Sequence, residues 1–215
     1  LFGIRVNNLD GCVSIAPNFP KGWEHANLTL KDVSLNYNRT GCMETFDIYC
    51  DRAEKKCIKI PMVSTAVDAV MLDGEVIPYE IKAGITKSFI VVETEKEGRF
   101  QLRIMHGKGD VPTLKITDTV LAGNDVAFEI KNGEMLEYLD ICETLEDITV
   151  VGNKVYAKTK KIAGHHTFFI RVKSGQYDSW LAADYEIIER DTEKAPVIPG
   201  NTFQPVDISK FFNCN

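Results

Sequence analysis

The sequence predicts an all-β protein made of two β-sandwich (Ig-like) domains in tandem. The first observation is a period-two alternation of apolar and polar residues, which marks strands that bury one face. In "FQLRIM" the apolar residues are Phe100, Leu102 and Ile104, and "TFFIRV" at residues 167–172 repeats the pattern. Segments of this kind recur along the chain, so we expect strands nearly throughout.

The second observation is a set of turn dipeptides between the alternating segments. Asp73–Gly74, Asn132–Gly133 and Gly152–Asn153 each follow such a segment. These residue types tolerate the positive φ angles that two-residue hairpins require, so we expect a hairpin at each. In residues 28–37 the alternation slips at Lys31–Asp32, which predicts a β-bulge within one strand.

The third observation is the lack of long helical periodicity. The best helical candidate, residues 133–147, mixes the two periods. A short helix and a loop with strand ends therefore both remain open for it. His106 stands beside a glycine and is expected to be a turn residue.

A break in the strand pattern at "HGKGDVP", residues 106–112, divides the chain. Residues 1–108 are predicted to form one sandwich. Residues 112–190 form a second block of about 80 residues, the size of a small Ig-like sandwich. Residues 191–215 contain three prolines and no clean alternation, so we expect a linker toward a further domain.

Composition and charge exclude several classes of protein. With 44% hydrophobic and 26% charged residues, the chain is globular in composition. The net charge of -6 argues against a nucleic-acid partner, which requires clustered Lys and Arg. The most basic stretch, residues 154–161, alternates with apolar residues as a solvated strand face does. No segment approaches the roughly 18 apolar residues of a membrane helix, so no membrane span is predicted.

Motifs for catalysis and metal binding are absent from the sequence. There is no nucleophile elbow, no phosphate loop and no HExxH, so we predict no catalytic residue and no cofactor in this chain. The six cysteines are Cys12, Cys42, Cys50, Cys57, Cys142 and Cys214. They contain no CxxC pair, so no metal site is predicted. A disulfide among Cys42, Cys50 and Cys57 and small buried thiols both remain open.

One loop carries residue types suited to carbohydrate binding. Gln176, Tyr177, Asp178 and Trp180 place aromatic rings beside planar polar groups between two strands. Such rings present an apolar face with a polar handle, which is how a protein stacks against a sugar ring. The alternative is that Trp180 folds back over the sandwich end or onto a neighbouring domain.

The opening stretch resembles a known family. "LFGI" and then "DGCVSIAPNFPKGWEHANLTLKDVSLNYNR" is similar to the segment that follows the (α/α)6 barrel in large bacterial glycoside hydrolase-like proteins of the α-L-rhamnosidase-like and related groups. The residues that match its pattern are Ile15, Pro17, Phe19, Pro20, Trp23, Ala26 and Leu28. "AVMLDGEVIPYEI" resembles a hairpin of the same sandwiches. The resemblance covers residues 1–105, with Cys12 as a departure where an aliphatic residue is common. Residues 112–190 resemble the Ig-like module that follows in some of these proteins.

This resemblance implies a role and a partner. The partner is the rest of the same polypeptide, notably an (α/α)6 barrel that ends just before Leu1 and supplies the catalytic acid and base. The residues expected to pack between the domains are Leu1, Phe2, Ile4, Phe19 and Trp23. The implied location is the periplasm or the exterior of a bacterium. Three functions remain open: an accessory region that braces the barrel and spaces later domains, a module that binds poly- or oligosaccharide, and a loop that completes the barrel's active site.

Overall fold

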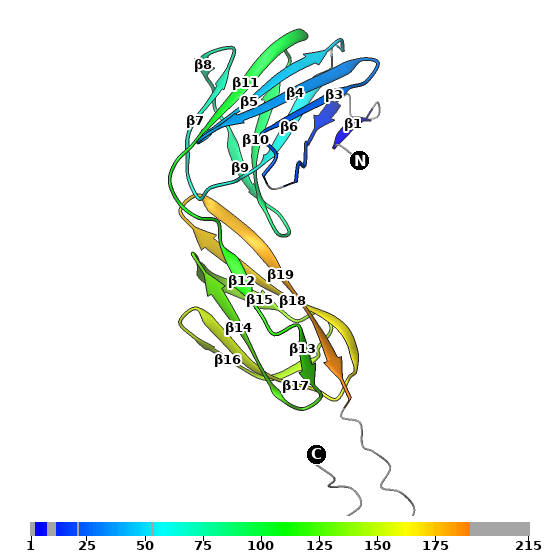
Figure 1. Cartoon of the computed structure of the whole chain (residues 1–215), viewed down its shortest axis with the longest axis vertical. Helices are drawn as coiled ribbons and strands as arrows, with labels where there is room; N and C mark the ends of the chain where they lie inside the picture. The colour runs from blue at the N-terminus through cyan, green and yellow to red at the C-terminus, as the bar shows by residue number, and fades with distance from the viewer. Residues whose placement is uncertain (1–2, 8–11, 21, 53, 190–215) are drawn as a thin grey trace, which may run out of the picture.

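The computed structural model shows an elongated, two-part molecule (Figure 1). It describes residues 3–7, 12–20, 22–52 and 54–189, with the backbone alone for residues 4–7. The described residues form nineteen strands and no helix, which confirms the all-β prediction. The expected linker at residues 191–215 lies outside the described residues, as does Cys214.

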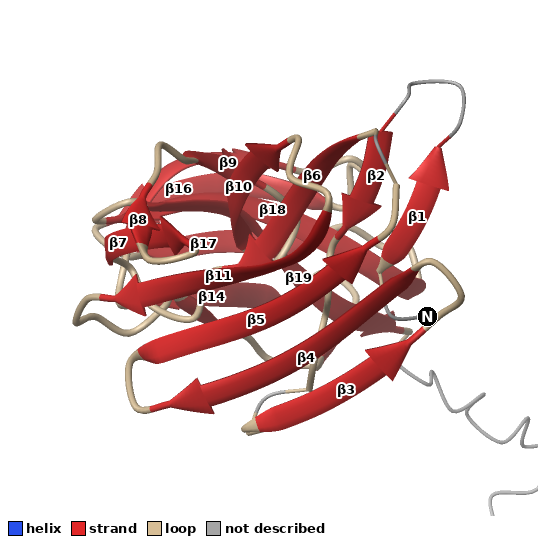
Figure 2. Ribbon diagram, turned by 90° about the horizontal axis from the view of Figure 1, so that it is seen from above, coloured by secondary structure: helices blue, strands red, loops and turns tan. Residues whose placement is uncertain are grey.

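The first part of the chain contributes eleven strands. They are β1 (Ile4–Asn7), β2 (Cys12–Ile15), β3 (His25–Thr29), β4 (Val33–Thr40), β5 (Met43–Cys50), β6 (Lys55–Pro61), β7 (Val67–Leu72), β8 (Glu75–Val76), β9 (Glu80–Ala83), β10 (Ser88–Thr94) and β11 (Gly98–His106). One sheet has the order β1-β2-β6-β10-β9 and the other β3-β4-β5-β11-β7-β8. Figure 2 shows the two sheets as layers of a sandwich, with β3, β4, β5 and β11 side by side in one of them.

The core of the first domain lies between these layers. Its fully buried side chains include Val13, Ile58 and Ile90 from one sheet and Leu35, Phe46 and Leu102 from the other. The alternation in "FQLRIM" has the expected effect, because Phe100, Leu102 and Ile104 of β11 are all buried while Arg103 is exposed. Burying each large apolar side chain contributes about 1.5–3 kcal/mol, so this face stabilises the sandwich.

The second part of the chain contributes eight strands. They are β12 (Thr113–Lys115), β13 (Thr119–Leu121), β14 (Asp125–Lys131), β15 (Glu134–Leu139), β16 (Leu145–Val151), β17 (Lys154–Thr159), β18 (Gly164–Ser174) and β19 (Tyr177–Ile188). The sheet orders are β12-β14-β17-β16 and β13-β19-β18-β15. If the strands are lettered along the chain as A, A′, B, C, D, E, F and G, these orders become A-B-E-D and A′-G-F-C. That is the strand order of the immunoglobulin sandwich, with A′ paired parallel to G.

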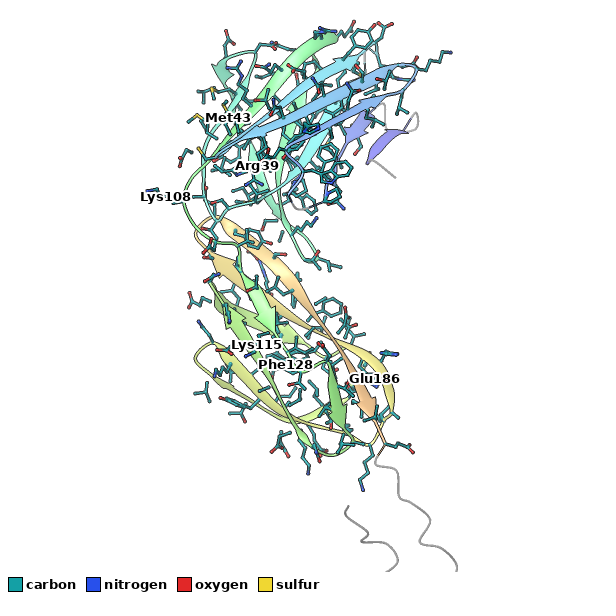
Figure 3. All side chains as sticks on the ribbon, viewed as in Figure 1. Arg39, Met43, Lys108, Lys115, Phe128 and Glu186 are labelled. Atoms are coloured by element: carbon teal, nitrogen blue, oxygen red, sulfur yellow. The ribbon has the colours of Figure 1, made fainter. Side chains whose placement is uncertain are left out.

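An aromatic pair occupies the centre of this Ig-like domain. Antibody domains join strands B and F by a disulfide between the sheets. Here Phe128 of β14 and Phe168 of β18 hold the corresponding strands together, with ring centroids 4.8 Å apart and both side chains fully buried. Figure 3 shows Phe128 inside the second sandwich. The ring of Tyr185 meets Phe128 edge-on at 5.7 Å. The domain is thus centred on apolar contact rather than on a covalent bond.

Two of the three expected hairpins form, and the third turn has a different role. Asp73 (φ 51°) and Gly74 (φ 89°) join β7 to β8. Gly152 (φ 58°) and Asn153 join β16 to β17. Asn132 has the positive φ expected of a turn, 60°, but β14 and β15 lie in different sheets. The Asn132–Gly133 turn therefore carries the chain across the sandwich, and the hairpin prediction there was wrong.

Two further local predictions are corrected or resolved. Lys31–Asp32 is not a bulge within one strand, because the chain reverses there and Leu30 N–H donates to the Val33 carbonyl over 2.8 Å to close a β3–β4 hairpin. The segment 133–147 resolves as β15, a turn and the start of β16, without a helix. The alternation of residues 28–37 slipped because two strands, not one, contributed to it.

The described cysteines form no disulfide with one another. They are Cys12, Cys42, Cys50, Cys57 and Cys142, all free thiols in the part of the chain that the structure describes. In the same part of the chain, no helix is long and apolar enough to cross a membrane. No group of three or more His, Cys, Asp or Glu side chains within it is placed to hold a metal ion.

Candidate functional site

The turn between β18 and β19 reaches out of the second domain and enters the first. Tyr177, the first residue of β19, is 2% exposed and belongs to the hydrophobic core of the first domain. Its hydroxyl donates to the Thr86 carbonyl over 3.3 Å. Burial raises the pKa of the Tyr177 hydroxyl, which favours the neutral form that donates this hydrogen bond. A strand residue of the second sandwich therefore belongs to the core of the first.

The backbone of β19 pairs with the loop between β9 and β10. Trp180 N–H donates to the Gly84 carbonyl over 3.0 Å, and Thr86 N–H donates to the Trp180 carbonyl over 2.6 Å. Ile85 and Trp180 form a parallel β-bridge. The Ser88 hydroxyl donates to the Asp178 carbonyl over 2.5 Å and accepts from Asp178 N–H over 2.8 Å. The start of β19 is thus hydrogen-bonded to the β9–β10 loop and to Ser88 of the first domain.

A second set of contacts ties the same turn to the segment before β7. Gln176 N–H donates to the Thr65 carbonyl over 2.9 Å, and its side-chain oxygen accepts from Val67 N–H over 2.5 Å. The connecting segment is tied to the same place, since the Ser64 hydroxyl donates to the Gly107 carbonyl over 2.7 Å. Three parts of the chain far apart in sequence meet here, which fixes the junction on several sides.

Asp178 is used within its own domain. Its two carboxylate oxygens accept from Nε and Nη2 of Arg171, each over 2.9 Å. Hydrogen bonds to Asp178 and then to Glu137 raise the pKa of the Arg171 guanidinium above its ordinary value. A bidentate pair of this kind fixes geometry as well as charge. It holds the β18–β19 hairpin in shape where it enters the junction.

The positions of residues 176–180 do not form the exposed sugar-binding platform that the sequence suggested. The ring of Tyr177 has no free face, and Asp178 is committed to Arg171. Gln176 is exposed, yet both ends of its amide contact the first domain, with the nitrogen 3.3 Å from the Tyr79 hydroxyl. The side chain of Trp180 is half-buried while its backbone bridges the domains. The alternative expected from the sequence, packing onto a neighbouring domain, describes this loop better.

Gly175 offers a direct test of how tightly the junction is built. Its φ is +56°, and an added Cβ would lie 2.8 Å from the Thr65 carbonyl oxygen. Gly152 has a nearly equal φ of +58° and open space around it. We expect Gly152→Ala to cost about 1 kcal/mol, from backbone strain alone. Gly175→Ala should cost about 2–3 kcal/mol, because the Thr65 contact adds to that strain. Urea unfolding of both variants measures the difference, and equal losses would show that the junction yields without cost.

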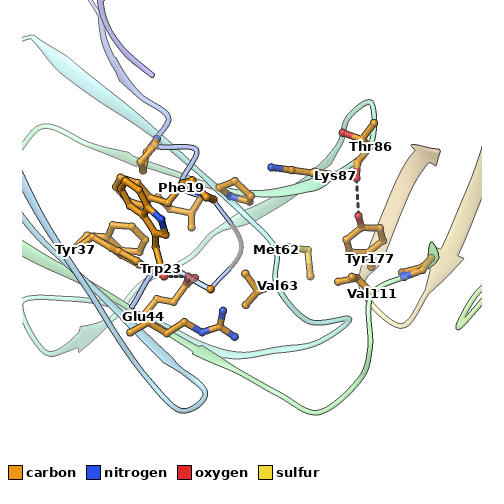
Figure 4. Close-up of a pocket in the computed structure, with 18 of the residues that line it drawn as sticks. Phe19, Trp23, Tyr37, Glu44, Met62, Val63, Thr86, Lys87, Val111 and Tyr177 are labelled. Carbon is orange, nitrogen blue, oxygen red and sulfur yellow. Dashed lines mark hydrogen bonds between the residues drawn. The ribbon is translucent and has the colours of Figure 1, made fainter. Parts of the chain in front are cut away.

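A pocket opens beside the junction, and its volume is about 390 Å³ (Figure 4). One wall is a row of four aromatic rings, Trp23, Phe19, Tyr37 and Phe46. Successive ring centroids are 6.3, 4.7 and 5.1 Å apart. Exposure falls along the row from 47% at Trp23 to 1% at Phe46. The row therefore runs from the protein surface at Trp23 into the core of the first domain at Phe46.

The opposite wall of the pocket comes from the junction itself. Met62 and Val63 precede β7, Val111 belongs to the connecting segment, and Tyr177 belongs to the second domain. Figure 4 shows Tyr177 and Val111 facing the aromatic row across Met62 and Val63. The pocket's shape consequently depends on how the two domains are held together.

A buried polar group lines the pocket beneath the aromatic row. Glu44 of β5 is 4% exposed, and its two oxygens meet the Tyr37 hydroxyl at 2.8 Å and His106 Nε2 at 2.7 Å. Burial, followed by the Glu44 charge, raises the pKa of Tyr37, so its hydroxyl remains a donor. His106 is therefore a buried strand residue, and the expectation of a turn residue was wrong. Its Nδ1 has no partner among the described residues.

Two cationic side chains complete the lining. Arg39 lies near the end of β4, directly across from Glu44 in the β4–β5 register. Its guanidinium makes no ion pair or hydrogen bond within the residues that the structure describes. Lys87 Nζ donates to the Asn18 side-chain oxygen over 2.6 Å at the rim. Among the described lining residues, the two cations Arg39 and Lys87 outnumber the one anion, Glu44.

The residues expected to pack between domains separate into three groups. Leu1 and Phe2, and the side chain of Ile4, lie outside the described part of the chain. Phe19 packs against the core of its own domain. Trp23 is stacked on Phe19 and keeps nearly half of its surface exposed. Among the described members of the set, Trp23 offers the most surface to a partner.

No protein-family model matches the sequence, and no curated protein matches it. A solved structure of tandem Ig repeats of Dlar is similar at 7% identity, over 70% of this chain and 92% of that chain, with a TM-score of 0.26. The I9–I11 tandem from titin is similar at 9% identity, over 81% and 85%, with a TM-score of 0.23. The Ig-like assignment rests here on the strand order of the second domain.

Proposed function

We propose that this chain is a non-catalytic accessory region of a larger bacterial glycoside hydrolase-like protein, in which two β-sandwiches space neighbouring modules at a fixed orientation. The observation that carries the spacing role is Tyr177, a residue of the second domain buried in the core of the first. Domains joined by a flexible linker keep separate cores and are expected to move relative to one another. The burial of Tyr177 in the first core, backbone hydrogen bonds to Gly84 and Thr86, and the hydrogen bond that holds the connecting segment oppose that motion.

The identity of the neighbours comes from the sequence resemblance alone. It supports a catalytic barrel on the N-terminal side, with this region bracing it and holding later domains away from it. Residues 176–180 are poorly placed to bind carbohydrate, because Gln176, Tyr177 and Asp178 make contacts at the junction.

The spacing role is tested by measuring whether the domains share one orientation in solution. In the isotopically labelled 215-residue chain, residual dipolar couplings from the two sandwiches should fit a single alignment tensor. Tensors of clearly different magnitude in the two domains would refute a fixed junction. The non-catalytic role is tested separately, by incubation with a panel of aryl glycosides and polysaccharides. Turnover that survives repurification would overturn that part.

A further inference from the structure

The pocket beside the junction combines three features that together define a ligand chemistry. The indole of Trp23 is 47% exposed and is supported from behind by Phe19, with the two rings inclined by 16°. A flat, rigid aromatic surface at the mouth of a pocket binds a flat apolar face at little cost in conformational entropy. The volume of about 390 Å³ is within the range of small-molecule sites and fits one or two rings.

The charge inside the pocket is the second feature. The Arg39 guanidinium lines the pocket and has no partner among the described residues. Glu44 stands opposite it in register, but both Glu44 oxygens are bonded to Tyr37 and His106. A guanidinium presents paired donors whose geometry matches a carboxylate, so Arg39 favours an anion of that shape. Lys87 at the rim adds a second cation.

The third feature is the position of the pocket between domains. Ligand sites often occur at domain interfaces, where two surfaces supply different walls. Here the first domain supplies the aromatic row and Arg39, while Tyr177 comes from the second domain. A ligand in this pocket would contact both domains at once and so add to the stability of the junction.

We infer that this pocket binds a ring-shaped ligand that carries a carboxylate, with the ring stacked on Trp23 and the carboxylate paired with Arg39. Two sources supply this chemistry: a uronic acid unit of a saccharide and an aryl carboxylic acid. The inference does not depend on the proposed spacing role, because a fixed junction needs no ligand and a ligand site needs no neighbouring barrel.

The experiment follows the indole N–H signal of Trp23 by NMR in the 215-residue chain. The chain has two tryptophans, so Trp180→Phe leaves Trp23 as the single indole. Glucuronate and phenylacetate are titrated at constant ionic strength, with glucose and phenylacetamide as uncharged counterparts. We expect a saturable shift with at least one acid and a response at least tenfold weaker with its neutral counterpart. Comparing the two acids identifies the source.

Two charge variants decide whether Arg39 is responsible. Arg39→Gln should weaken binding of the active acid at least tenfold, and far-UV circular dichroism checks that the variant stays folded. Arg103→Gln removes an exposed charge of β11 that does not line the pocket, and it should leave binding unchanged. Absence of a saturable shift with either acid would overturn the inference. An equal response to acid and neutral compound, or equal binding by both variants, would also overturn it.

Discussion

Tyr177→Ala is expected to destabilise the first domain, although the residue belongs to a strand of the second. Its ring is 2% exposed within the first core, and truncating a buried aromatic side chain costs about 3–5 kcal/mol. The first domain should therefore unfold at a clearly lower urea concentration. Tyr177→Phe keeps the ring and loses one long hydrogen bond, so it should cost about 1 kcal/mol or less.

The control for this prediction is Tyr156→Ala on β17. Tyr156 is 44% exposed, so the same chemical change should alter the free energy of unfolding by about 0.5 kcal/mol or less. Far-UV circular dichroism in a urea gradient measures all three variants. A Tyr177→Ala loss no larger than that of Tyr156→Ala would mean that the junction contributes nothing to the stability of the first core.

Phe128→Ala is the second variant with a large expected effect. Phe128 is fully buried between the sheets and contacts the rings of Phe168 and Tyr185, so its removal should cost about 3–5 kcal/mol. When the second domain unfolds, β19 withdraws Tyr177 from the first core. We therefore expect the first domain to lose stability in this variant as well.

Phe169→Ala provides the matched control for Phe128→Ala. Phe169 follows Phe168 on β18, points to the other face of the sheet and is half-buried. Its truncation should cost less than that of Phe128. Hydrogen exchange of amides in β5 and β14 reports on the two domains separately. Unchanged protection in β5 when β14 loses protection would contradict the coupling between the domains.

The fold was largely predictable because its signals are local. The burial of Phe100, Leu102 and Ile104 follows from period-two alternation, and the β7–β8 hairpin follows from Asp73–Gly74. Predictions from local sequence were wrong where one pattern fits two structures. A positive φ at Asn132 marks a turn, but sequence does not say whether the next strand stays in the same sheet.

The candidate site was much less predictable because its contacts are distant in sequence. His106 and Glu44 are 62 positions apart, and Ser88 and Asp178 are 90 apart. No periodicity or spacing rule connects such residues. Tyr177 and Trp180 stood out as unusual residues in a loop, and that signal was real. These residues are unusual because they contact the other domain. The sequence had left two explanations open for them, sugar binding and packing onto a neighbouring domain.

The burial of Tyr177 in the first core also has a consequence for the order of folding during synthesis. All strands of the first sandwich are complete by His106, yet Tyr177 is translated 71 residues later. At the usual translation rate of roughly 5–20 residues per second, about 4–14 s pass between the synthesis of His106 and that of Tyr177. During that interval the pocket wall near Tyr37 and Met62 lacks the ring of Tyr177. The core of the first domain is thus completed only after the β18–β19 turn of the second has been made.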